Sequence, residues 1–298
     1  MKLIVEIENE NTRLDQYLTE KLEISRSQCQ QLIKAGHVLI NGQKEKTGYM
    51  IKEDDEIVVQ IPEKEGKMEI MPIPMNLEIV YEDEYLAIIN KPKGLVVHPA
   101  NSYKEETLVH GLMHQIKPLS TVNGEFRPGI VHRLDKETSG LLVIAKDNQT
   151  HELLSEMLKK HEINRHYKAL IYGSIEDEGK IDAPILRHPV NRLKMAVIKN
   201  GKEAVTHFKT LKRYEEYSLI ECQLETGRTH QIRVHLSYID HPILGDALYG
   251  PKKVYGTTGQ FLHAYKLSLI HPITHESLSF EIPLNKEFQQ LLDTLDQA

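Results

Sequence analysis

A polar cluster followed at once by a continuous apolar run marks residues 127–147 of this sequence. The run Leu141–Ala145 has the length of a buried strand and contains no charged residue. Directly before it stand His132, Arg133 and Asp135, followed by a turn-forming Thr-Ser-Gly. A chain with this pattern must hold ionisable side chains at the edge of its hydrophobic core. Asp135 therefore either caps the turn or is placed for chemistry, and spacing alone leaves both interpretations open.

Composition narrows the class of protein. The chain has 298 residues, of which 40% are hydrophobic and 27% charged, enough for one sizeable core and a small additional module. No apolar run approaches the roughly 20 residues that span a membrane, and the first ten residues contain no apolar signal segment. Cys29 and Cys222 are too few for a zinc or disulfide framework. We therefore expect a cytoplasmic protein without membrane association. Its net charge of −6 requires any RNA contact to use a local basic face.

The first 61 residues predict a small module of two helices and a β-ribbon. Apolar residues recur at helical spacing within Leu14–Leu22. Ser25 begins a capping box for a second helix, and Gly36 is its natural end. Short strands follow around Asn41–Gly42, a strong signal for a tight turn. We expect one domain over residues 1–61.

The composition changes after this module. Residues 62–74 are rich in proline, glycine and charge, which predicts a linker. We expect a second, larger domain over residues 75–298, built largely from strands. Within it, the dipeptide Asn200-Gly201 predicts a hairpin that joins a strand at 195–198 to one at 204–209.

Several ordered motifs carry a family resemblance. The sequence HRLDKETSG beginning at His132 resembles the signature of the RluA/RluD class of RNA pseudouridine synthases. NKPKGLVVHP from Asn90 and GRTHQIRVHL from Gly227 resemble two further motifs of that family. The sequences RLDQYL from Arg13 and SRSQCQQLIKAGHVLINGQ from Ser25 are similar to the S4-type RNA-binding domain. The resemblance covers nearly the whole chain.

The resemblance implies an α+β fold for the catalytic domain. We expect a mixed, largely antiparallel sheet with flanking helices and a central cleft, together with the small N-terminal S4-type α/β module. It implies that the enzyme isomerises specific uridines in RNA, most of all in large-subunit ribosomal RNA, without a cofactor. We expect a monomer.

The resemblance also assigns roles to individual residues. Asp135 corresponds to the essential catalytic carboxylate, Tyr167 to the active-site tyrosine, and Arg228 to the basic partner of Asp135. Arg133 is expected to hold the flipped nucleotide, and Leu267 to lie near the target base. The residues expected to shape the site are Lys91, His98 and His132.

In the N-terminal module, Arg13, Arg26 and Lys34 are implied to meet RNA phosphates. The alternative for these three cations is an ordinary solvated helix face.

The chemistry explains why a carboxylate and a cation are needed together. Breaking the N1–C1′ bond of uridine builds positive charge on the sugar, and a carboxylate beside C1′ stabilises or captures it. Asp135 would do this or would abstract a proton from C2′, and the sequence does not choose between them. A guanidinium from Arg228 would keep the carboxylate ionised and orient it. His110 and His114 stand at i, i+4 spacing, but no third ligand completes a site, so we expect no metal.

Three functions remain open on sequence alone. The first is an RNA uridine isomerase, acting on ribosomal RNA or on transfer RNA. The second is an RNA-binding ribosome-assembly factor with little or no catalysis. The third is a hydrolase that cleaves N-glycosidic bonds with Asp135. Pseudouridine has the mass of uridine whereas hydrolysis frees uracil, so mass spectrometry separates the first from the third.

Overall fold

The chain forms two compact units, Met1–Glu69 and Ile70–Ala298. The computed structural model describes residues 1–22, 24–60, 70–99, 103, 105–124, 126–251 and 259–297. Most of the predicted linker at 62–74 lies outside these described residues. Ile70, within that predicted linker, is buried in the core of the second unit. The domain limits at 61 and 75 remain predictions.

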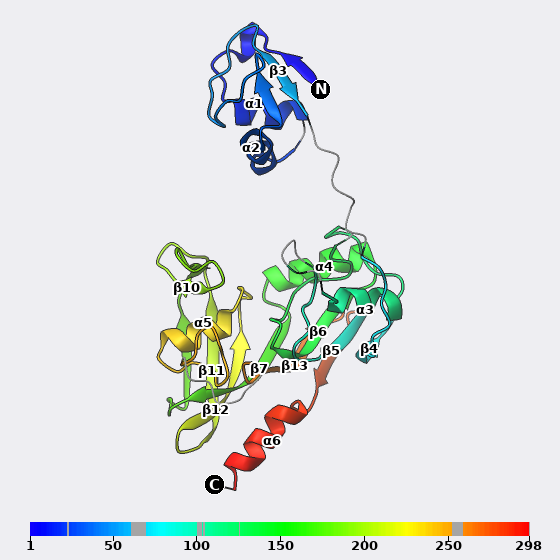
Figure 1. The fold of residues 1–298 in the computed structure, drawn as a ribbon. Helices are drawn as coiled ribbons and strands as arrows, with labels where there is room; N and C mark the ends of the chain where they lie inside the picture. Colours follow the sequence, from blue (N-terminus) through cyan, green and yellow to red (C-terminus); the bar gives the residue numbers. More distant parts are fainter. Residues whose placement is uncertain are drawn as a thin grey trace. The chain divides into compact units, whose positions relative to one another are not determined.

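The first unit is a three-stranded antiparallel sheet with two helices (Figure 1). The strand order is β1-β3-β2, and the apolar faces of both helices contribute to one hydrophobic core. The predicted capping box at Ser25 is present, and Gly36 ends the second helix in the left-handed region at φ 81°. The elements are β1 (Lys2–Ile4), a 3₁₀ turn (Ile7–Asn9), α1 (Leu14–Leu22), α2 (Arg26–Ala35), β2 (Val38–Ile40) and β3 (Glu56–Val59).

The second unit is built around a nine-stranded sheet with helices packed against it (Figure 1). Its strand order is β4-β5-β6-β13-β7-β12-β11-β8, with β14 paired to β13. All pairs are antiparallel except β6 with β13. The strands are β4 (Glu78–Glu82), β5 (Leu86–Lys91), β6 (Ser139–Ala145), β7 (Asn164–Tyr172), β8 (Glu178–Asp182), β11 (Val205–Arg213), β12 (Tyr217–Leu224), β13 (Leu262–Ile270) and β14 (Ser277–Glu281). A separate ribbon consists of β9 (Ile185–Arg187) and β10 (Met195–Val197). The helices are α3 (Leu108–Gln115), α4 (Asn148–Lys159), α5 (Gln231–Tyr238) and α6 (Lys286–Leu295).

Strand β6 is buried along its whole length, as its apolar sequence predicts. Side chains alternate across a strand, so β6 serves two cores. Leu142 and Ile144 join the cluster that contains residues of α3, whereas Leu141 and Val143 join the cluster that contains Leu154 of α4. The sheet is therefore covered on both faces at the point where the loop carrying Asp135 enters it. The expected α+β fold is confirmed.

The predicted hairpin at Asn200-Gly201 is wrong. A turn does form, because the N–H of Gly201 donates to the carbonyl of Ile198 at 2.7 Å. The strand before it, β10, pairs with β9, whereas β11 pairs with β8 and β12. A two-residue turn signal indicates a local reversal of the chain, but tertiary packing decides which strands pair.

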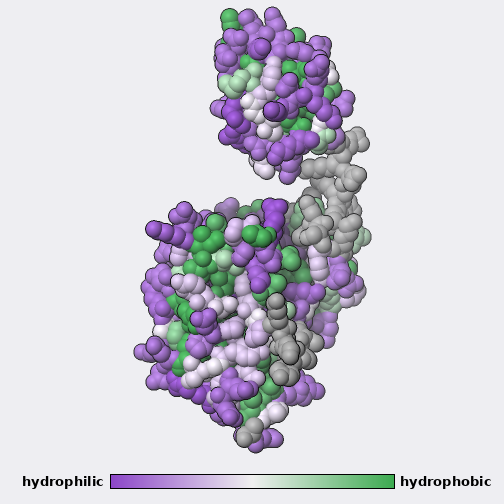
Figure 2. Space-filling view, turned by 60° about the vertical axis from the view of Figure 1, so that its left-hand side comes forward, coloured by the Kyte–Doolittle hydropathy of each residue, from purple (hydrophilic) through white to green (hydrophobic). Residues whose placement is uncertain are grey.

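The face of the molecule drawn in Figure 2 is mostly polar. Hydrophilic residues make up most of the face of each unit drawn in Figure 2, with smaller hydrophobic areas between them. Within the described part of the chain, no helix combines the length and the apolar character needed to cross a bilayer.

Candidate active site

The loop that carries Asp135 lies directly before β6 and is anchored to it. The carbonyl of Asp135 accepts a hydrogen bond from the N–H of Thr138 at 3.1 Å, which closes a turn. Nε2 of His132 accepts a hydrogen bond from the N–H of Val143 at 3.1 Å. Burial, and secondarily the charge of Arg165, lowers the pKa of His132 to about 3. The ring is therefore neutral, as its acceptor role requires, and His132 holds the loop on the strand.

Lys91 supports the same loop from β5. Its side chain is fully buried, and Nζ donates to the carbonyls of Pro92 and Leu95 at 2.8 Å each and of Lys136 at 3.1 Å. Burial lowers the pKa of Lys91 to about 7. Lys91 thus joins the carbonyl of Lys136, the residue next to Asp135, to the segment that follows β5.

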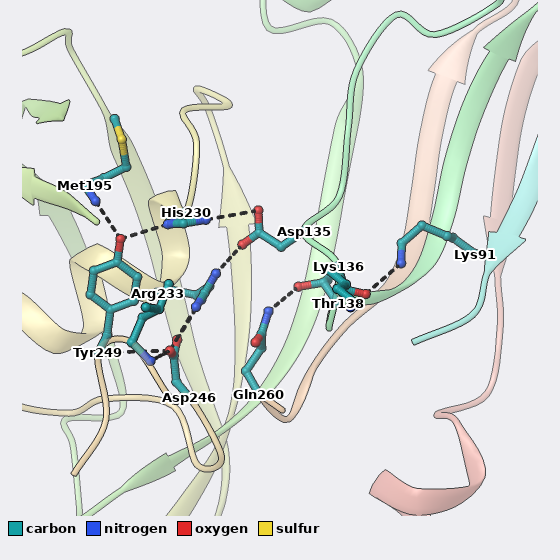
Figure 3. Close-up of polar contacts among 11 residues, drawn as sticks. Lys91, Asp135, Lys136, Thr138, Met195, His230, Arg233, Asp246, Tyr249 and Gln260 are labelled. Atoms are coloured by element: carbon teal, nitrogen blue, oxygen red, sulfur yellow. Dashed lines mark hydrogen bonds and ion pairs between the residues drawn. The ribbon is translucent and has the colours of Figure 1, made fainter. Parts of the chain in front are cut away.

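The carboxylate of Asp135 pairs with Arg233, the third residue of α5 (Figure 3). Nη1 of Arg233 lies 2.9 Å from Oδ2 of Asp135. The other side of the guanidinium donates to Asp246, with Nε 2.6 Å from Oδ2 and Nη2 2.9 Å from Oδ1. Asp246 is fully buried and also accepts from the N–H groups of Leu248 and Tyr249. Burial alone would lower the pKa of Arg233, but the hydrogen bonds and charges of the two carboxylates outweigh it and raise that pKa above its ordinary value.

The prediction that Arg228 pairs with Asp135 is wrong. The Nε of Arg228 donates to the carbonyl of Glu203 at 2.8 Å, and its side chain is exposed. Both arginines belong to the motif GRTHQIRVHL, but Arg228 precedes α5 whereas Arg233 lies inside it. Sequence reasoning also missed Asp246, although a second arginine in that motif and a carboxylate in HPILGDALYG were visible signals.

His230 is a further neighbour of Asp135 that sequence reasoning did not assign to the site. It precedes α5 in the left-handed region at φ 56°. Its Nε2 lies 3.8 Å from Oδ1 of Asp135, and its Nδ1 lies 2.8 Å from the hydroxyl of Tyr249. That hydroxyl also accepts from the N–H of Met195 at 2.7 Å. Burial lowers the pKa of His230, and its Nε2 lies beyond hydrogen-bond distance of the carboxylate.

A cavity of about 720 Å³ opens beside Asp135. Tyr167 from β7 lines it and is only 5% exposed. Burial raises the pKa of Tyr167, so its phenol keeps its proton. Among the predicted site residues, those that line this cavity are His132, Arg133, Asp135, Tyr167 and Arg228.

Lys91, Leu267 and His98 are not among the described residues that line the cavity. Leu267 is 1% exposed and packs with Leu141 and Val143, and it is not among the described residues that line the cavity, so the prediction for it is wrong. Leu262 on the same strand lines the cavity instead. His98 is buried outside the cavity lining, and burial, with the charges of Arg127 and Arg133 behind it, lowers its pKa to about 4.

In the N-terminal unit, two of the three predicted cations converge on one buried carboxylate. Asp15 is fully buried and accepts from Arg13 at 3.0 and 3.1 Å, and from Nε of Arg26 at 3.1 Å. The hydrogen bond from Arg13 is the largest cause of the lowered pKa of Asp15. Both arginine side chains remain about half exposed, at 44% and 54%. Lys34 is exposed in the last turn of α2.

Among the described residues, no group of three or more His, Cys, Asp or Glu is arranged to hold a metal ion. Nδ1 of His110, one of the two histidines at i, i+4 spacing, instead accepts from the N–H of Thr107 at 3.0 Å and helps cap α3.

The family model of RNA pseudouridylate synthases matches residues 85–238, just over half of the chain, and the match includes both Asp135 and Arg233. The chain belongs to the RNA pseudouridine synthase family. Its members are RNA isomerases, and the resemblance inferred from the motifs is confirmed. The model of the S4 domain matches residues 12–57, within the first unit.

Similar proteins agree with this assignment. An uncharacterised RNA pseudouridine synthase of Bacillus subtilis, YlyB, is 46% identical over 97% of this chain and 95% of its own length. The ribosomal large subunit pseudouridine synthase D of Neisseria meningitidis serogroup B is 44% identical over 98% of this chain and 81% of its own length. The solved structure of human RNA pseudouridylate synthase domain containing 4 matches with a TM-score of 0.58 and 27% identity, over 73% of this chain and 92% of that one.

Proposed function

We propose that this RNA isomerase converts uridines of large-subunit ribosomal RNA to pseudouridine, with Asp135 as the carboxylate that acts on the ribose. The observation that carries the proposal is the Asp135–Arg233 pair beside a cavity that Tyr167 also lines. The choice of RNA is supported by the name of the Neisseria relative, ribosomal large subunit pseudouridine synthase D.

Asp135 is held in one orientation but stays open to the cavity. Its side chain is 16% exposed, and Arg233 binds only Oδ2. The oxygen Oδ1 lies 3.8 Å from Nε2 of His230, which is beyond hydrogen-bond distance, so that ring does not occupy Oδ1 with a hydrogen bond. A charge-assisted hydrogen bond fixes the carboxylate plane and compensates its charge in a partly dry site. Asp135 would then bond to C1′ or take the C2′ proton as the N1–C1′ bond breaks.

Tyr167 and Arg133 supply two further functions. The buried ring of Tyr167 offers a stacking surface for uracil, and its retained proton makes it a hydrogen-bond donor rather than a base. Arg133 is exposed at the cavity and makes no hydrogen bond or ion pair with any residue that the structure describes. A free guanidinium at the entrance is suited to hold the RNA while the target nucleotide leaves its stack.

We propose that the S4 unit is an RNA anchor that uses Arg13, Arg26 and Lys34. Asp15 orients the two arginines without burying them, so that both present donors to a phosphate. We propose further that the protein acts as a monomer in the cytoplasm, without metal or cofactor.

The test is a map of pseudouridine in ribosomal and transfer RNA from cells that lack this protein, complemented with variants. Wild type and Glu137→Gln, which removes another carboxylate of the same loop, should restore the missing pseudouridines. Asp135→Asn should restore none while its RNA affinity is retained. If only transfer RNA lacks pseudouridine in these cells, the substrate is transfer RNA and not ribosomal RNA. An unchanged map would favour an assembly factor, and free uracil released in vitro would favour a hydrolase.

A further inference from the structure

Arg165 is a buried cation without an anionic partner. It lies on β7 two positions before Tyr167, is 7% exposed, and lines the same cavity. Its side chain makes no ion pair or hydrogen bond with any described residue. Its Nε is shielded from solvent and has no hydrogen-bond partner in the described part of the chain.

Other buried cations of the catalytic unit are satisfied. Arg233, also 7% exposed, binds two carboxylates. Lys146 pairs with Glu82 at 2.8 Å, and Nζ of Lys91 has three carbonyl partners. Burial of an unpaired charge costs several kcal/mol. Arg165 is therefore placed for a negatively charged group that the described residues do not supply.

The surroundings locate its guanidinium. A Cβ on Gly227 would lie 2.8 Å from Nη1 of Arg165, so the guanidinium packs against the backbone at the start of the motif GRTHQIRVHL. Its positive charge acts on the rings of both His132 and Tyr167. Arg165 thus occupies the part of the cavity next to the tyrosine that would stack on the base.

We propose that Arg165 binds the uracil anion formed when the glycosidic bond breaks, an inference that rests on the proposed function. As the N1–C1′ bond breaks, its electron pair passes to N1 and is delocalised onto the O2 and O4 carbonyls of uracil. The positive charge left on the sugar is compensated by Asp135. The guanidinium then donates to a uracil oxygen until C5 bonds to C1′. The C5 proton then passes to water, and N1 takes up a proton from water, which leaves neutral pseudouridine. Both routes considered for Asp135 release the same anion.

A backbone phosphate is the other anion that RNA could supply. The exposed guanidinium groups of Arg133 and Arg228 at the same cavity are suited to it. A phosphate is charged in every state, whereas uracil gains charge only during the reaction. A buried donor whose partner becomes anionic only in the transition state raises the rate more than the affinity.

The experiment measures single-turnover rates with excess enzyme. The probe is an unmodified large-subunit ribosomal RNA transcript tritiated at C5 of uridine, because formation of the C5–C1′ bond releases that tritium to water. Arg165→Gln should lower the rate by roughly 10²-fold, the effect of removing one preorganised donor, with unchanged RNA affinity. Arg165→Lys, which keeps the charge, should recover part of the rate. The matched control is Arg192→Gln, an exposed arginine outside the cavity lining, which should leave both the rate and the RNA affinity unchanged.

A second transcript, containing 5-fluorouridine, tests the anion directly. Fluorine stabilises the uracil anion, so Arg165→Gln should slow the reaction less on this transcript than on the first. The rate is measured by mass spectrometry as the loss of 5-fluorouridine from digests. An equal defect on both transcripts would overturn the proposal. If Arg165→Gln instead binds RNA more weakly, and the slope of log affinity against log salt concentration falls by about 1, Arg165 binds a phosphate.

Stability gives an independent readout. Removal of an unpaired buried charge leaves no other charge unpaired, so Arg165→Gln should unfold at a urea concentration no lower than wild type. A clearly lower midpoint would show that Arg165 has a structural partner and would overturn the inference. If wild type forms no pseudouridine in any RNA, the proposed function fails before the variants are compared.

Discussion

Nη1 of Arg233 lies 2.9 Å from Oδ2 of Asp135, although 98 positions separate the two residues in the chain. Asp246 holds the opposite side of the same guanidinium, so one buried arginine connects two carboxylates from different loops. The arrangement makes the orientation of Asp135 depend on the position of α5.

Loss of Arg233 should therefore damage both stability and activity. Arg233→Gln leaves the charge of Asp246 buried without its cation, and the free energy of unfolding should fall by about 3–5 kcal/mol. Chemical denaturation measures this loss. Arg228→Gln is the control and should change stability by less than about 0.5 kcal/mol, because its side chain is exposed. Equal losses in the two variants would contradict the assignment of Arg233.

The stability of the catalytic unit should decrease in mild acid. Burial lowers the pKa of His98 and of His263 to about 4 each, from 6.5. Below pH 6.5 these histidines bind protons in the unfolded chain but stay neutral in the folded chain. Their contribution to the free energy of unfolding is therefore complete above pH 6.5 and is lost as the pH falls towards 4. Each such histidine removes about 1.4 kcal/mol per pH unit in that window.

Denaturation at several pH values checks this dependence. His98→Leu should flatten the slope of unfolding free energy against pH between pH 6.5 and 4.5 by about 1.4 kcal/mol per pH unit, the contribution of one proton. A slope that His98→Leu does not change would mean that His98 takes up a proton in the folded state.

RNA binding by the S4 unit should depend on Arg26. If its guanidinium meets a phosphate, Arg26→Gln should weaken binding similarly for all RNA sequences and reduce the salt slope by about 1. Filter binding at several salt concentrations measures that slope. Lys52→Gln, an exposed lysine outside both helices, is the control. If wild type and Arg26→Gln show the same dependence of log affinity on log salt concentration, Arg26 is an ordinary solvated cation that does not contact a phosphate.

Gly140 should tolerate no side chain. Its φ is 115°, and a Cβ would lie 2.2 Å from the carbonyl oxygen of Ala264, where β6 meets β13. Gly140→Ala should cost at least about 3 kcal/mol because the backbone must shift. Gly124→Ala has a similar positive φ, 78°, but open space around it, so only the left-handed cost of about 1–2 kcal/mol applies. Thermal unfolding of the two variants separates the effects.

Local sequence was sufficient for the parts of the protein that local forces decide. The capping box at Ser25, the left-handed Gly36 and the buried strand β6 follow from neighbouring residues alone. The motif around Asp135 likewise predicted a carboxylate directly before a buried strand.

Tertiary structure decided which distant groups meet that carboxylate. Arg228 and Arg233 are equivalent cations in one motif, and only the start of α5 after His230 turns Arg233, not Arg228, to Asp135 and Asp246. The unpaired burial of Arg165 is equally invisible in sequence, since it depends on which strands surround β7. Hydrophobic periodicity and capping act over a few residues, whereas the partner of a charge is set by the packing of the whole sheet and its helices.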